Sequence, residues 1–146
     1  SNSEGLDKMK INSNSNHYHT SGGKISNDGN LNIEKKKLDN FEFELDNKII
    51  ALKIDTEGHE YKVLEGGLKK IEINLPEIIF EINENSFNKS INLLKKFNYN
   101  FYYIDEEKNN FFQINKFDPK LIRPEGSNCL ATQKKHKDIL AYKYSL

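Results

Sequence analysis

The segment 52–60 constrains the fold of this chain more than any other part of its sequence. Its residues are Leu-Lys-Ile-Asp-Thr-Glu-Gly-His-Glu, and they lie between an apolar run at 49–52 and an amphipathic run at 61–71. This order predicts a buried strand, a turn that carries carboxylates and a glycine, and then a helix. Because ligands of open α/β sheets bind at the carboxyl ends of strands, the turn is a candidate site.

The bulk composition excludes several classes of partner. The 146 residues allow one domain with a real core. The 22 basic and 22 acidic residues balance, so we predict no nucleic-acid partner and no membrane-surface binding. No apolar run approaches the roughly 18–20 residues of a membrane span. The single cysteine, Cys129, excludes an internal disulfide, which favours a cytoplasmic location.

The chain divides by composition at about residue 30. Residues 1–30 predict a polar arm, rich in Ser, Asn and Gly, with one short edge strand at 9–11. Residues 31–146 predict the folded unit, which begins with a short strand at 31–33. Alternating apolar residues at 41–45 indicate a strand, although Asp39 is also placed to cap a short helix there.

The remaining pattern alternates strands and helices. We predict a central strand at 49–54, because it is almost wholly apolar, and further strands at 78–82, 101–104, 111–114 and 128–132. A helix after Gly58 is expected to break at Gly66-Gly67. A second helix, capped by Asn85 or Ser86, carries the apolar stripe Phe87, Ile91, Leu94 and Phe97. This order indicates an α/β, doubly wound sheet with an antiparallel carboxyl-terminal edge.

These residues resemble the signature of FkbM-type methyltransferases. The resemblance rests on Lys53-Ile54-Asp55-Thr56-Glu57-Gly58-His59-Glu60, Val63-Leu64-Glu65-Gly66, Leu38-Asp39, the strand 76–81, the passage 93–99 and the terminal strand 128–131. It implies a Rossmann-like class I methyltransferase sheet. It also implies S-adenosylmethionine-dependent methyl transfer, usually to a hydroxyl oxygen of a sugar or other small metabolite.

The chain departs from that family at its amino terminus. Such enzymes hold the cofactor with a glycine-rich loop after the first strand. Gly22-Gly23 lies in a polar loop with no strand before it, and residues 1–5 resemble the turn after the family's third strand. We therefore expect the first three strands to be lacking, and the cofactor-binding residues stay unknown. The strand 49–54 would then be an open edge, covered by a second copy, the polar arm or a separate chain.

The turn after the strand 49–54 offers the catalytic candidates Asp55, Glu57 and His59. Methyl transfer to an alcohol needs removal of the hydroxyl proton, and imidazole is the side chain that titrates nearest neutral pH. Alternatively, Asp55 and Glu57 hold Mg²⁺, or Asp55 merely caps the helix while Glu57 and Glu60 occupy its first turn.

Two residues are candidates for binding the acceptor. Glu81 follows the next strand and would lie at the same sheet edge if the strands are parallel, while Lys53 lies near the end of the strand 49–54. The alternative is that Glu81 and Lys53 simply form an ion pair. No metal site is predicted, because the pair His17 and His19 has no further ligand close by in sequence. The competing function is a non-catalytic remnant or interaction domain that no longer binds cofactor.

Overall fold

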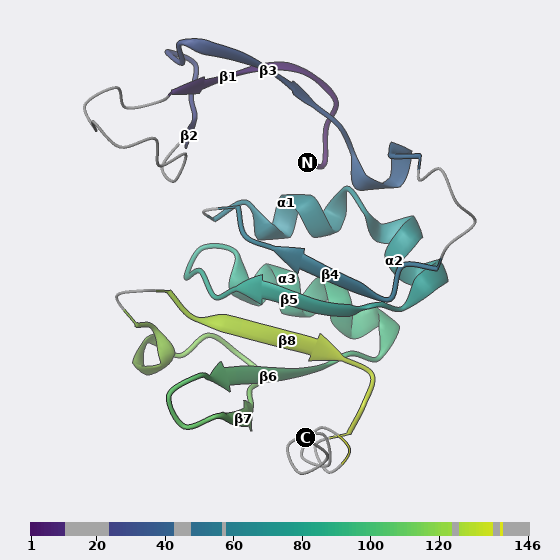
Figure 1. The fold of residues 1–146 in the computed structure, drawn as a ribbon, viewed down its shortest axis with the longest axis vertical. Coiled ribbons are helices and arrows are strands. Elements are labelled where there is room, and N and C mark those ends of the chain that lie inside the picture. Colours follow the sequence, from purple (N-terminus) through teal and green to yellow (C-terminus); the bar gives the residue numbers. More distant parts are fainter. Residues whose placement is uncertain (11–23, 43–47, 57, 124–125, 136–137, 139–146) are drawn as a thin grey trace.

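A mixed sheet of five strands forms the centre of the chain (Figure 1). The computed structural model describes residues 1–10, 24–42, 48–56, 58–123, 126–135 and 138. The strands are β4 (Ala51–Ile54), β5 (Glu77–Glu81), β6 (Asn100–Asp105), β7 (Asn110–Gln113) and β8 (Asn128–Thr132), in the order β4-β5-β8-β6-β7. This arrangement is consistent with a Rossmann-like fold.

The strand directions follow from how the strands are connected. β4 and β5 are parallel and are joined by α1 (Glu60–Glu65) and α2 (Leu68–Asn74), whereas α3 (Phe87–Leu94) and the 3-10 helix η2 (Lys95–Phe97) lead to β6. β8 pairs antiparallel with both β5 and β6, and β7 forms the predicted antiparallel hairpin with β6. The expected antiparallel carboxyl-terminal strands are confirmed, but β8 lies inside the sheet rather than at its edge.

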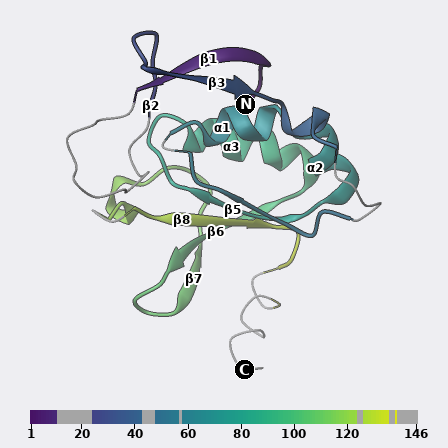
Figure 2. The same ribbon diagram turned by 45° about the horizontal axis from the view of Figure 1, so that its top comes forward.

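The helices α1, α2 and α3 lie on one face of this sheet (Figure 2). Alternate residues of the strands face them, including Ile78 and Phe80 of β5, which are fully buried. The predicted stripe of α3 is confirmed, since Phe87, Ile91 and Leu94 are all buried against the sheet. Each such side chain contributes about 1.5–3 kcal/mol on burial. In the described segments, no helix has the length and apolar character that a membrane span requires.

β4 is an edge strand among the described residues, as expected for a sheet that lacks the first three strands, and it does not have the central position that its apolar run alone predicted. Among the described residues it pairs with β5 alone, and only Ile54 of β4 is buried. Ile50, just before it, is 75% exposed. An apolar run is typical of strands covered on both sides, but here one side has no strand partner in the described part of the chain.

The amino-terminal sheet is a separate antiparallel unit of β1 (Gly5–Lys10), β2 (Lys24–Ile25) and β3 (Leu31–Lys35), in the order β2-β1-β3. The strand predicted at 31–33 is confirmed as β3. The predicted short edge strand at 9–11 is wrong, because β1 is longer and lies in the middle, although Ile11 is outside the described residues. No residue of β1 or β3 is buried. The unit lies over α1 and does not pair with β4 in its described part (Figure 1).

The predicted helix break at Gly66-Gly67 is confirmed, and the contacts explain it. A Cβ atom on Gly66 would collide with the carbonyl oxygen of Ser1, and one on Gly67 would lie 2.6 Å from Cδ2 of Leu38. The two glycines therefore let the amino-terminal segment pack directly on the α1–α2 junction.

The neighbouring 3-10 helix η1 (Leu38–Asn40) caps α2 from a distance. The carboxylate of Asp39 accepts hydrogen bonds from the backbone N–H groups of Lys69 (3.2 Å) and Lys70 (3.0 Å). Gly67, at the N-cap position of α2, has no side chain to do this. Asp39 thus caps a helix about 30 residues away in sequence. Residues 43–45 of the strand predicted at 41–45 lie outside the described part.

Candidate functional site

The loop after β4 carries the predicted catalytic residues at the sheet edge. Asp55 leaves the strand with its side chain 58% exposed, and its Oδ2 atom lies 3.5 Å from Nζ of Lys53. His59 is half-buried at the N-cap position of α1, and its backbone N–H donates to the carbonyl oxygen of Thr56. Glu57 lies outside the described residues. The alternative that Asp55 caps α1 is wrong, because the cap position has no side-chain hydrogen bond.

The side chain of Glu60 holds the loop after β4 in place through hydrogen bonds. Glu60 is the first residue of α1, as the alternative of a first-turn acid predicted, but it is fully buried. Its Oε1 atom accepts hydrogen bonds from the Thr56 N–H (3.2 Å), the Thr56 hydroxyl (3.2 Å) and the Gly58 N–H (3.0 Å). Its Oε2 atom accepts from the Ser86 hydroxyl at 3.1 Å. A buried carboxylate with four donors fixes the loop that presents Asp55 and His59.

The loop after β5 packs against the loop after β4 and is hydrogen-bonded to Glu60 at the start of α1. Of the two predicted caps, Ser86 rather than Asn85 is the N-cap residue of α3, but its hydroxyl donates to Glu60 instead of forming a side-chain cap. Asn83 lies against Gly58, where a Cβ atom would be 3.2 Å from the Asn83 Nδ2 atom. Gly58 also has φ +91°, a conformation that residues with a side chain rarely adopt. The two loops therefore hold one another in place at the carboxyl ends of β4 and β5.

Glu81 opens onto a pocket at the end of β5, called here the β5 pocket. Its volume is about 400 Å³, within the range of small-molecule sites. Its polar lining consists of Glu81, Asn83, Glu84 and Arg123, and its apolar lining of Ile82, Phe117, Pro119 and Ile122. Gly126 closes one side, with the carboxylate of Glu81 3.3 Å from the position of its missing Cβ.

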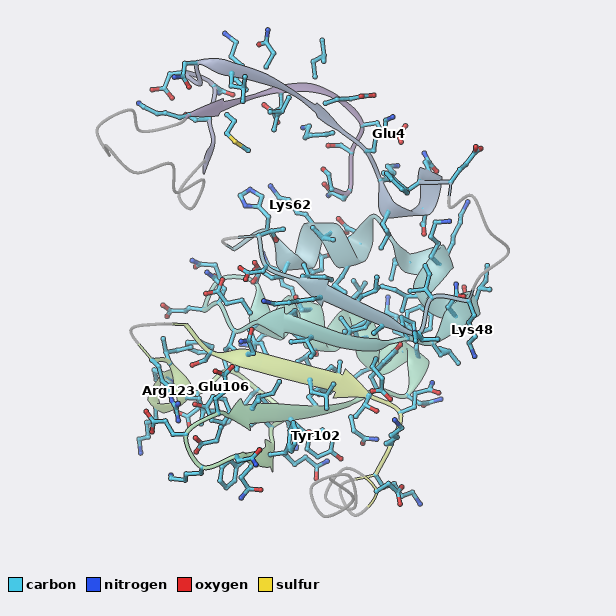
Figure 3. The ribbon with its side chains drawn as sticks, in the orientation of Figure 1. Glu4, Lys48, Lys62, Tyr102, Glu106 and Arg123 are labelled. Atoms are coloured by element: carbon cyan, nitrogen blue, oxygen red, sulfur yellow. The ribbon has the colours of Figure 1, made fainter. Side chains whose placement is uncertain are left out.

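Arg123 lines the β5 pocket and forms an ion pair with Asp105 at the end of β6. Its Nη2 atom lies 2.6 Å from Oδ1 of Asp105 and 3.6 Å from Oε2 of Glu107, and its guanidinium lies 5.9 Å from the ring centroid of Tyr103. Burial alone would raise the pKa of Asp105, but the hydrogen bonds from the Lys108 N–H and from Arg123 outweigh it and lower the pKa. Figure 3 shows Arg123 and Glu106 at the end of the sheet opposite Lys48.

A metal ion or the cofactor would need a set of ligands or a glycine-rich loop among the described residues. No group of three metal-binding side chains gathers among them, so Mg²⁺ has no complete protein cage there. The glycines at 66–67 lie between two helices and are covered by Ser1 and Leu38. Among the described residues, no glycine-rich loop lies between a strand and a helix.

Asp55 and His59, in the loop after β4, and Glu81, at the end of β5, lie at the same carboxyl end of the sheet, since β4 and β5 are parallel and in register; of the three, only Glu81 lines the β5 pocket. Sequence reasoning missed Glu60 as the anchor of the loop, and it missed Asp105 and Arg123 entirely. Glu60 had a local signal, because Thr56 and Gly58 are close in sequence. Asp105 and Arg123 are 18 residues apart and gave no such signal.

Comparison with known proteins agrees with the geometry. Residues 2–101 match the sequence profile of a family described as the Methyltransferase FkbM domain. The matched region includes the loop after β4 and the end of β5, and it ends before Asp105 and Arg123. The chain has no significant match among curated proteins or solved structures.

Proposed function

We propose, because this chain belongs to the FkbM methyltransferase family, that it forms the acceptor side of an S-adenosylmethionine-dependent O-methyltransferase. The acceptor would be a sugar or another small metabolite with a free hydroxyl group. The observation that supports this proposal most is that the loop carrying Asp55 and His59 lies at the same carboxyl end of the sheet as Glu81, which lines a pocket of small-molecule size.

The loop after β4 would supply the proton acceptor. Transfer of a methyl group to an alcohol oxygen is faster when a base takes the hydroxyl proton as the bond forms. Asp55 and His59 are the described candidates, and both belong to the loop that Glu60 holds in place. Glu81 would accept a hydrogen bond from another hydroxyl of the acceptor and so orient the ring. These roles are proposals for each residue.

The part of the enzyme that binds the cofactor would pair with the exposed edge of β4. Exposed main-chain groups on an apolar edge strand favour pairing with another strand. The amino-terminal sheet does not provide it in its described part, which leaves a second copy of the chain or another segment of a longer protein. We propose that a second copy pairs with β4 and completes the site.

Calorimetric titration with S-adenosylhomocysteine, with and without Mg²⁺, tests the donor side. Binding at about micromolar affinity, a free energy near −8 kcal/mol, supports the enzyme. If no binding occurs at millimolar ligand, the chain by itself is the non-catalytic remnant or interaction domain.

Light scattering tests the second copy separately. Ile50→Lys should prevent association, because it places a charge beside the β4 edge, whereas Ile73→Lys should not. The two isoleucines are matched controls, since they are 75% and 78% exposed and Ile73 lies on α2. A wild-type chain that stays monomeric at high concentration would exclude the second copy.

A further inference from the structure

We propose that residues 139–146 of this chain dock on the face of the five-stranded sheet opposite α1, α2 and α3, called here the far face. The far face is a different surface from the candidate site, and the proposal does not depend on methyl transfer. Three observations carry it: an apolar row on the far face, the path of the chain after β8, and the composition and length of residues 139–146.

The apolar row crosses the far face from β5 to β6. Successive side chains of a strand point to opposite faces of the sheet. Ile78 and Phe101 belong to the core beneath the helices, so their neighbours Ile79 and Tyr102 point away from it. Leu130 of β8 pairs with both Ile79 and Tyr102 and therefore lies between them on the same face. Figure 2 shows the helices on the other side of the sheet.

Burial is uneven along this row. Tyr102 is 1% exposed, although it is not a member of the core cluster beneath the helices. Ile79 and Leu130 are only half-buried. The far face is therefore covered most completely at β6 and less completely toward β5. Large apolar side chains on a sheet face are stabilised by a second layer that removes them from water.

The chain after β8 turns toward the far face. Nζ of Lys134 lies 2.9 Å from Oε1 of Glu77, which is two residues before Ile79 and so points to the same face. Burial, and then the negative charge of Asp138, raise the pKa of Tyr102, so Asp138 lies near the well-buried end of the row. Residues 139–146 thus begin beside the row.

Residues 139–146 have the composition and the length to cover the row. Their sequence is Ile-Leu-Ala-Tyr-Lys-Tyr-Ser-Leu, in which only the lysine is charged. Strands lie about 4.8 Å apart, so β5 is about 10 Å from β6 across β8. Eight residues span about 12 Å as a helix and about 26 Å when extended. The segment can therefore reach from Tyr102 to Ile79 in either conformation.

Attachment favours this segment over a second copy of the chain. A segment joined to the surface through a few residues acts at an effective concentration of about millimolar, whereas a second copy has to bind from solution. Docking on the far face also leaves the edge of β4 free for the pairing proposed above.

Methyl NMR of the intact chain tests the contact directly. We expect nuclear Overhauser effects between the methyl groups of Ile79 and Leu130 and the rings of Tyr142 or Tyr144. Ile78 is the matched control, because it is the neighbour of Ile79 but is fully buried on the helix side, and it should show none. Dilution should leave the effects unchanged.

Two substitutions in the segment locate the contact. Leu140→Asp should move the methyl signals of Ile79 and Leu130 toward those of a chain that stops at Asp138. It should also raise the fluorescence of an apolar dye such as ANS and lower Tm by about 3–6 °C. Ser145→Asp adds the same charge at a position that is already polar, so it should change none of these signals.

The outcomes separate the segment from other covers of the far face. Overhauser effects that weaken on dilution would assign the cover to a second copy and overturn the proposal. Their absence, or equal effects of Leu140→Asp and Ser145→Asp, would overturn it as well. If the shortened chain does not fold, the Overhauser effects of the intact chain still give the answer. Binding of S-adenosylhomocysteine is measured separately, so either proposal can fail without the other.

Discussion

The five-stranded sheet and the amino-terminal sheet are held together by different forces. In the first, strands and α3 share a continuous apolar core, with Ile78, Phe80 and Phe87 fully buried. In the second, no residue of β1 or β3 is buried, and a hydrogen bond from Asn2 Nδ2 to Glu65 Oε2, at 2.6 Å, links the amino-terminal segment to α1. The first sheet is therefore stabilised by its own burial, while the second depends on a few contacts with its neighbour.

The candidate site belongs entirely to the first region. Its loops are anchored by Glu60 and its pocket by the Asp105–Arg123 pair, and neither group contacts the amino-terminal sheet through the hydrogen bonds and ion pairs described for them. Perturbing the second region should thus leave the site intact, and perturbing Glu60 should not. The following changes test this division, starting with the largest expected effect.

Glu60→Ala should destabilise the large sheet most. It removes the acceptor for the Thr56, Gly58 and Ser86 donors and leaves them without a partner in a buried place. We expect a loss of about 2–4 kcal/mol in the free energy of unfolding, measured with urea. Glu60→Gln should lose less, because it keeps the shape and one acceptor.

Glu72→Ala is the control for Glu60→Ala. Glu72 is an exposed residue of α2, so its substitution should change the free energy of unfolding by less than about 0.5 kcal/mol. Equal effects of the two alanines would show that Glu60 does not anchor the loop.

Gly66→Ala should weaken the attachment of the amino-terminal sheet. The new methyl group collides with the Ser1 carbonyl oxygen, a local cost of about 1–3 kcal/mol. Because the backbone of Gly66 has helical angles, the core itself should be unaffected. Hydrogen exchange should quicken in β1 and β3 and stay unchanged in β5 and β8.

Lys69→Ala, at an exposed position on α2, is the control for Gly66→Ala and should alter neither region. If Gly66→Ala quickens exchange in β5 and β8 as much as in β1 and β3, then the two sheets unfold as one unit and the comparison fails.

Asp39→Ala should have a smaller effect at the junction of the two regions. It removes the carboxylate that caps α2 through the Lys69 and Lys70 N–H groups, at a cost of about 1 kcal/mol in urea denaturation. Asp39→Asn keeps one acceptor oxygen and should recover part of this loss. Equal losses for Asn and Ala would mean that the capping bonds contribute nothing.

Local patterns predicted much of the first region. The apolar run at 78–82 and the apolar stripe of α3 each extend over several residues, so they specify strand and helix without knowledge of distant contacts. The break at Gly66-Gly67 was predicted for a local reason, the cost of glycine in a helix. Its fuller cause, contact with Ser1 and Leu38, comes from the tertiary fold.

Positions that depend on distant partners were not predictable from sequence. The apolar run at β4 is by itself typical of a central strand, and its open edge was expected only from the family resemblance, which indicated that neighbouring strands are lacking. Serine is a preferred N-cap residue and Ser86 occupies the N-cap position of α3, yet its hydroxyl donates to the carboxylate of Glu60, 26 residues away. The same limit applies to the pocket, whose lining combines residues 81–84 with Phe117, Pro119, Ile122, Arg123 and Gly126.

Acid titration gives the smallest effect and sharpens the comparison further. Folding lowers the pKa of Asp105 from its usual value of 3.8. The ionised carboxylate therefore stabilises the folded chain fully above pH 3.8, and this contribution is lost as pH falls through the lower, folded-state pKa. Asp105→Asn should therefore flatten the decline of Tm between about pH 5 and pH 2.

Asp7→Asn is the counterpart of Asp105→Asn in the amino-terminal sheet. The hydrogen bond from Lys35 lowers the pKa of Asp7 as well, but this carboxylate is more exposed, at 23% against 4% for Asp105. Water screens it more strongly, and its loss acts on the unit that lacks a core. We expect Asp7→Asn to leave the global Tm unchanged at every pH, because the cooperative transition reports the large sheet. A matching shift in both variants would instead make the amino-terminal sheet part of the same cooperative unit.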